Sequence, residues 1–164
     1  VNMCCCLSFR TPDEMYTLGL QQMYAVNPQI NDQQASLSKQ DIKAFIVALK
    51  TLKKAADQGQ AGAWFSFGEA VWNCVKPKVI AAIEQAFQNN TPLQPVEYNS
   101  FGKKSVLLDF RRALAQRYLL IAFQNECPGS EHKLKEIQQY AAEQRRLAEQ
   151  AGLIDLTTIS YQKH

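Results

Sequence analysis

Hydrophobic positions recur at steps of three and four residues along most of this chain, a spacing that places them on one side of an α-helix. The clearest pattern runs from Lys39 to Asp57, where apolar residues alternate with lysines. Ser38 stands at the N-cap position, and Gly59 follows the last turn. The spacing predicts an amphipathic helix over these residues, with its lysines facing outward.

The stretch from Ser105 to Gln124 is a second strong helical pattern, and its second half is apolar on every side. A helix of this kind must be covered by several neighbours. We therefore expect a central helix over about residues 105–126, with Arg117 near the middle of its apolar side. An arginine in that position needs a partner, either a carboxylate in a buried ion pair or an anionic ligand.

Three further segments read as helices. The cap and first turn Thr11-Pro12-Asp13-Glu14 predict a helix from Pro12 to about Val26, ended by Asn27-Pro28. Residues 61–88 keep one apolar stripe through Pro77, which predicts a single helix kinked near Pro77, with a break into two helices as the alternative. A last helix is expected over residues 131–151.

These elements predict an all-α fold, a single-domain helical bundle of about five principal helices. The length of 164 residues fits one domain. We place the bundle at residues 12–152, after a flexible cysteine-rich segment at 1–11 and before a tail at 153–164. The tail pattern is compatible with a docked helix, an edge strand or a partner-binding strand. Residues 89–102 form the longest expected loop.

Charge is unevenly distributed along the chain. Residues 38–58 carry a net charge of +3 and residues 103–117 a net charge of +4, while the remainder sums to −4. If the two basic segments are neighbours in the fold, they form one basic patch that suits an acidic partner. A purely solvated face is the competing interpretation. The candidate partner-binding residues are Lys43, Lys50, Lys53, Lys54, Arg111 and Arg112.

Cysteine usage bears on compartment and on the membrane. Three of the five cysteines, Cys4, Cys5 and Cys6, follow Met3 directly. If Met3 starts the natural chain, this cluster is a candidate for S-acylation, and an apolar tail is the alternative. The odd number of cysteines, without a CxxC pair, suits a reducing compartment. We expect a cytoplasmic protein without a membrane span, held peripherally on membranes if the cluster is acylated.

The sequence contains no catalytic constellation, no metal-ligand spacing and no phosphate-binding loop. We therefore expect a non-enzymatic protein without a cofactor or a metal. An enzymatic alternative would require Glu69, Asp109, His132 or Cys74 to converge in a cleft.

The function that fits these observations is a non-catalytic interaction or adaptor module whose partner is another protein. An anionic membrane surface is a further expected partner, and nucleic acid binding is not expected. The alternative is a small helical sensor for an apolar ligand or a lipid. Its pocket would be lined by Trp64, Phe65, Phe67 and Trp72, with Arg117 as the polar anchor. Aromatic residues at helical spacing also fit an ordinary core.

Overall fold

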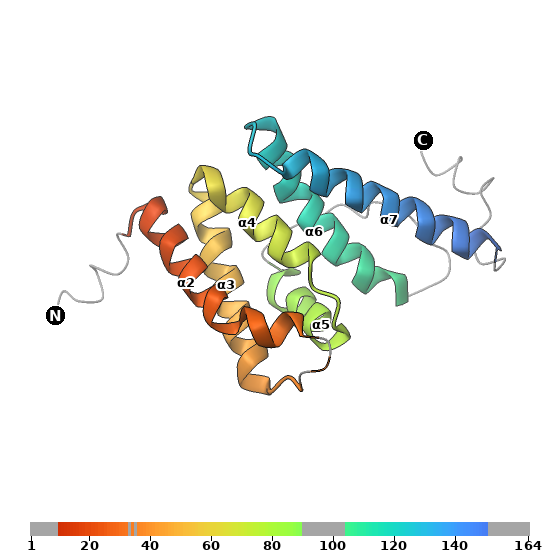
Figure 1. Ribbon diagram of the computed structural model, residues 1–164, viewed down its shortest axis with the longest axis horizontal. Helices are drawn as coiled ribbons and strands as arrows, with labels where there is room; N and C mark the ends of the chain where they lie inside the picture. The colour runs from red at the N-terminus through yellow and green to blue at the C-terminus, as the bar shows by residue number, and fades with distance from the viewer. Residues whose placement is uncertain (1–9, 33, 35, 90–103, 151–164) are drawn as a thin grey trace.

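The computed structural model describes residues 10–32, 34, 36–89 and 104–150, and for residues 104–109 and Ala148 it describes the backbone alone. Within these ranges the regular elements are all α-helices, and there is no strand (Figure 1). The predicted all-α bundle is confirmed. The helices are α2 (Pro12–Asn31), α3 (Lys39–Asp57), α4 (Ala61–Trp72), α5 (Pro77–Phe87), α6 (Lys104–Gln124) and α7 (Ser130–Gln150).

Helix α6 packs most extensively on α4 and also contacts α5 and α7. Its second half is not covered on every side, contrary to the prediction from the sequence, because Leu120 and Phe123 are 46% and 45% exposed. Helices α2 and α3 pack closely on each other, and α3 also contacts α4 and α5. In Figure 1, α2 and α3 lie on one side of α4, while α6 and α7 lie on the other.

Phe67 of α4 lies fully buried in the hydrophobic core. Its ring centroid is 5.6 Å from that of Phe87 in α5 and 4.7 Å from that of Tyr118 in α6, both in edge-to-face geometry. Such pairs contribute about 0.5–1.5 kcal/mol beyond the burial of their surface. One aromatic cluster therefore joins α4, α5 and α6.

Gly68 allows α4 and α6 to approach each other closely. A Cβ atom at this position would lie 2.7 Å from Leu119 Cγ and 3.1 Å from the carbonyl oxygen of Ala115. Both distances are shorter than ordinary van der Waals contacts, so a larger side chain would push the two helices apart. The face of α6 that turns inward is thus the one that meets this glycine.

Helix α3 begins and ends at the predicted residues. Ser38 Oγ accepts a hydrogen bond from the backbone N–H of Asp41 at 3.1 Å, and Asp41 Oδ2 accepts one from the N–H of Ser38 at 3.3 Å. This capping box satisfies two backbone donors that the first helical turn leaves open. Leu37 and Ile42 pack against the core at this end. The signals that start α3 are all local in sequence.

The single kinked helix predicted over residues 61–88 is wrong, because α4 ends at Trp72 and α5 begins at Pro77. Proline suits the first position of a helix, where no backbone N–H is needed. Val71 and Val79 are buried on either side of the break, whereas Val75, expected on the same stripe, is 61% exposed. The apolar stripe is therefore interrupted at the break and resumes in α5, because both helices cover the same core.

Pro28 lies inside a continuous helix, unlike Pro77, which begins one. Helix α2 continues through Pro28 to Asn31, so the predicted end near Val26 is wrong. A proline inside a helix removes one backbone hydrogen bond and crowds the preceding turn. Val26 and Ile30 are buried on either side of Pro28. Burial of Ile30 offsets that cost and extends the helix by one turn.

Several predictions concern residues outside the described ranges. They are the N-terminal segment with Cys4, Cys5 and Cys6, most of the loop at 89–102, and the tail at 153–164. Among the described helices, none combines the length and the hydropathy that a membrane span requires. In the same part of the chain, no group of three or more His, Cys, Asp or Glu residues is placed to hold a metal ion.

Candidate interaction surface on helix α3

The lysines of α3 form a narrow stripe on the outside of the bundle. Lys43, Val47, Lys50 and Lys54 follow one another at steps of four, three and four residues, which places them on one side of the helix. All four are exposed, and the apolar Val47 keeps 47% of its surface in water. The opposite side of α3 supplies core residues, among them Phe45 and Leu49. We call these four residues the lysine stripe.

Lys53 differs from the other lysines because it is held within the fold. Its Nζ lies 2.7 Å from Asp57 Oδ2, and its side chain is only 16% exposed. The other carboxylate oxygen of Asp57 accepts a hydrogen bond from the Tyr118 hydroxyl of α6 at 2.8 Å. Burial, and then this hydrogen bond, raise the pKa of Tyr118, so the hydroxyl remains a donor at neutral pH.

Asp57 is therefore paired with Lys53 and hydrogen-bonded by Tyr118. By contrast, in the described ranges no hydrogen bond or ion pair involves the side chains of Lys43, Lys50 or Lys54. Lys50 and Lys54 stand four residues apart, where two like charges on a helix repel each other by about 0.2–0.5 kcal/mol. The lysine stripe is thus a row of uncompensated positive charge.

A pocket of about 440 Å³ opens at the C-terminal end of the lysine stripe. Its cationic wall is formed by Lys50, Lys53 and Lys54, and Phe87 of α5 contributes an apolar edge. Asp57 and Gln58 complete the lining. Because the carboxylate of Asp57 is engaged by Lys53 and Tyr118, the pocket suits the carboxylate of a partner.

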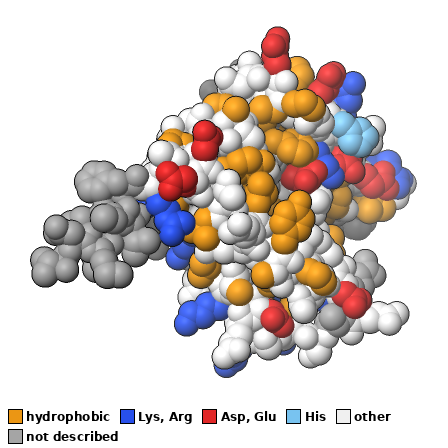
Figure 2. Space-filling model, turned by 60° about the vertical axis from the view of Figure 1, so that its left-hand side comes forward, with side chains coloured by type: hydrophobic (Ala, Val, Ile, Leu, Met, Phe, Trp, Pro, Cys, Tyr) orange, Lys and Arg blue, Asp and Glu red, His pale blue; other side chains and the backbone are white. Residues whose placement is uncertain are grey.

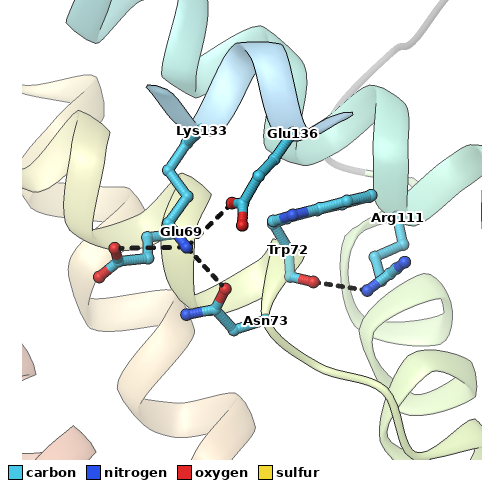
Figure 3. A network of polar contacts seen from close by, with 6 residues as sticks. All are labelled: Glu69, Trp72, Asn73, Arg111, Lys133 and Glu136. Carbon is cyan, nitrogen blue, oxygen red and sulfur yellow. Dashed lines mark hydrogen bonds and ion pairs between the residues drawn. The ribbon is translucent and has the colours of Figure 1, made fainter. Parts of the chain in front are cut away.

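Arg111 and Arg112 do not belong to this surface, contrary to the prediction of one combined basic face. Both are buried, with 5% and 6% of their surface exposed. Arg111 Nη1 donates to the carbonyl oxygen of Trp72 at 2.5 Å (Figure 3). The same atom also donates to the carbonyl oxygen of Cys74. Burial lowers the pKa of Arg111, while Tyr140 and Cys74 act in the opposite direction. Arg111 joins helices and is not available to a partner.

Arg112 faces α7 instead. It lines a groove of about 260 Å³ between α6 and α7, together with Gln116, Ile137 and Arg145. Because Arg111 and Arg112 are both buried, neither of them extends the lysine stripe.

The residues predicted to line an apolar pocket are dispersed. Phe67 is fully buried in the core, and Trp72 packs edge to face on Tyr140 of α7 with 5.2 Å between ring centroids. Trp64 and Phe65 are half-buried against the core. Neither of the two pockets above is lined by any of these aromatic residues.

The predicted burial of Arg117 is wrong. Arg117 is exposed, and the arginines inside the bundle are Arg111 and Arg112. The inward face of α6 is made by Leu114, Ala115, Tyr118 and Leu119. Arg117 therefore cannot serve as the polar anchor of a pocket around Phe67.

The residues weighed for catalysis have structural roles or lie apart. Cys74 Sγ donates to the carbonyl oxygen of Ala70 at 3.2 Å, and burial raises its pKa to about 12 against the opposing effect of Arg111. A thiol of this kind is not a nucleophile at neutral pH. His132 is exposed, and the side chain of Asp109 is outside the described part of the structure.

Glu69 belongs to an ionic cluster that fastens α4 to α7. Lys133 Nζ lies 3.9 Å from Glu69 Oε2 and 3.2 Å from Glu136 Oε2, and it donates to Asn73 Oδ1 at 3.3 Å (Figure 3). The lysine side chain is mostly covered, and all three of its partners are oxygen acceptors. Lys133 thus offsets one of the two carboxylate charges and ties α4 to α7, which gives Glu69 a structural role.

Two features of the surface were missed from the sequence. The i, i+4 spacing of Lys53 and Asp57 is a local signal for their ion pair. The hydrogen bond from Tyr118 to Asp57 spans 61 positions and has no such signal.

Comparison with known proteins finds no relative, since no protein-family model, no curated protein and no solved structure matches this chain.

Proposed function

We propose that this protein is a non-catalytic interaction module that binds an acidic protein partner through the lysine stripe of α3. The observation that carries this proposal is the row of exposed, uncompensated charge at Lys43, Lys50 and Lys54, beside a Lys53 that is already paired. Like charges placed in a row repel one another and do not stabilise the fold. They become favourable when carboxylates of a partner approach them.

The expected strength of this contact is modest. An exposed ion pair contributes about 0.2–1 kcal/mol, so three such pairs supply about 0.6–3 kcal/mol. Their larger effect is on association, because a row of one charge sign steers an oppositely charged partner and excludes partners of like charge. Such binding weakens as salt screens the charges, with a screening length of about 8 Å at physiological ionic strength.

The proposal is tested by affinity capture from cell extract, followed by mass spectrometry at low and at physiological salt. The test variant combines Lys43→Glu, Lys50→Glu and Lys54→Glu. The control combines Lys78→Glu, Lys135→Glu and Arg146→Glu, which reverse three other exposed charges, two of them paired on the surface with Glu131 and Glu143. We expect the wild-type protein and the control to retain acidic proteins at low salt, and the test variant to lose them.

Two results would overturn the proposal. Equal retention by the test variant and the control would show that the lysine stripe does not make the contact. Capture that does not weaken with salt would indicate that the partner binds an apolar surface instead. Figure 2 shows hydrophobic side chains gathered over the middle of one face of the molecule.

A further inference from the structure

The shape of the lysine stripe restricts the kind of partner that fits it. Lys43 and Lys54 are 11 positions apart on a straight helix, which corresponds to a length of about 16 Å. The four positions span only about 60° around the helix axis. The acidic residues of α3 lie outside this row: Asp41 caps the start of the helix through the backbone N–H of Ser38, and Asp57 pairs with Lys53. A narrow, straight row of this kind matches a rod-shaped partner better than a flat anionic surface.

The order of residues within the stripe gives it a pattern. Along α3 the exposed Val47 separates Lys43, on its N-terminal side, from Lys50 and Lys54, on its C-terminal side. A helix laid alongside α3 rises by the same 1.5 Å per residue, so its facing positions repeat these intervals. A complementary helix therefore carries three acids and one apolar residue at matching positions.

Helix dipoles favour one direction of the partner. Lys50 and Lys54 lie in the C-terminal half of α3, whose end carries partial negative charge. An antiparallel partner brings its positive N-terminal end to that place. Acidic residues in the first turns of the partner are then stabilised by its own dipole as well as by the two lysines.

Resting on the proposed function, we propose that the partner segment is an acidic amphipathic helix that lies antiparallel to α3 along the lysine stripe. Its first acid enters the pocket formed by Lys50, Lys53 and Lys54, and its second acid, four residues later, meets Lys50. An apolar side chain three residues after the second acid covers Val47. A third acid, four residues after that apolar side chain, meets Lys43.

The test uses three synthetic peptides of 16 residues with blocked ends and equal composition. The first carries Glu at positions 3, 7 and 14 and Leu at position 10, in an Ala, Gln and Ser background. The second has the same residues spread around the helix, and the third has the first sequence reversed. Binding to the full chain is measured by fluorescence anisotropy at low salt, and circular dichroism verifies that the three peptides have equal helicity.

We expect the first peptide to bind at least fivefold more tightly than the other two. Lys50→Gln and Lys54→Gln should each weaken its binding about twofold to fivefold, and Val47→Ser by a similar factor. The control Lys135→Gln, on a helix that makes no extensive contact with α3, should leave binding unchanged. These substitutions are at exposed positions, and circular dichroism of each variant verifies that it folds.

The alternative outcomes separate this inference from the proposed function. If all three peptides bind equally and the lysine substitutions weaken the binding of each peptide, the proposed helical register is wrong. The proposed function, binding of an acidic partner, is then still supported. If only the reversed peptide binds tightly, the antiparallel direction is wrong. If no peptide binds but phosphatidylserine vesicles bind through the same lysines, the partner is a membrane and both proposals fail.

Discussion

The guanidinium of Arg111 lies 4.5 Å from the centre of the Trp72 ring, while Nη1 of the same side chain donates to the Trp72 carbonyl at 2.5 Å. Trp72 is the last residue of α4, so its carbonyl has no partner within that helix. A cation from α6 thus closes the C-terminus of α4, where the helix dipole favours positive charge. Trp72 in turn packs on Tyr140, so this pair links α4, α6 and α7.

Removal of Arg111 should destabilise the bundle strongly. Arg111→Ala leaves the carbonyls of Trp72 and Cys74 without their donor, and an unsatisfied buried group costs about 1–3 kcal/mol. We expect a loss of about 3 kcal/mol in the free energy of unfolding, measured by urea titration. Arg117→Ala, an exposed arginine in the same helix, should change it by less than about 0.5 kcal/mol. Equal losses would contradict this role of Arg111.

Gly68→Ala tests the close approach of α4 and α6. The added methyl group would overlap Leu119, and overpacking of this kind costs about 1–3 kcal/mol. Leu119→Ala alone should cost about 2–5 kcal/mol, because it opens a cavity in the core. In the Leu119→Ala background the glycine substitution should cost clearly less than in the wild type. A double-mutant cycle in urea measures this coupling, and strict additivity would be the contrary result.

The buried thiol of Cys74 should make stability depend on pH in mildly alkaline solution. Its pKa rises from 9.0 to about 12 in the folded protein, so above pH 9 the unfolded state gives up a proton that the folded state keeps. The unfolded state then binds fewer protons, and stability falls as pH rises, by up to about 1.4 kcal/mol per pH unit. The contribution is fully present below pH 9 and is lost between pH 9 and about 12.

This dependence is measured by urea unfolding at pH 8, 9 and 10 for the wild type and Cys74→Val. The variant removes the thiol and keeps an apolar side chain of similar size. Tyr118, whose pKa is also raised, is present in both proteins, so the difference between the two slopes belongs to Cys74. We expect the flatter slope in the variant, and parallel slopes would refute the assignment.

Pro28 and Pro77 should respond in opposite directions when each is replaced by alanine. Pro28→Ala restores a backbone donor inside α2 and should raise the free energy of unfolding by about 1–2 kcal/mol. Pro77→Ala gains no hydrogen bond at the first position of α5 and makes the unfolded chain more flexible, so it should lower stability by about 0.4–1 kcal/mol. Thermal unfolding followed by circular dichroism compares them, and changes of the same sign would be inconsistent with these positions.

The sequence by itself determined the helical class and the whole of α3. The start of α3 depends on Ser38 and Asp41, which lie within one turn of each other, and its outward side carries lysines that have no place in a core. Signals of this kind are local, so no knowledge of the neighbouring helices is needed. The exposure of Lys43, Lys50 and Lys54 follows directly from the same periodicity.

The inward face of α6 was decided by the tertiary structure. Where a helix is apolar on every side, periodicity does not distinguish Arg117 from Arg111, and Gly68 of α4 selects the face that carries Ala115 and Leu119. Arg111 then becomes buried because the break before Pro77 leaves carbonyls that need a donor. The separation of Arg111 from the lysine stripe thus depends on contacts between residues nearly 40 positions apart, which no local pattern encodes.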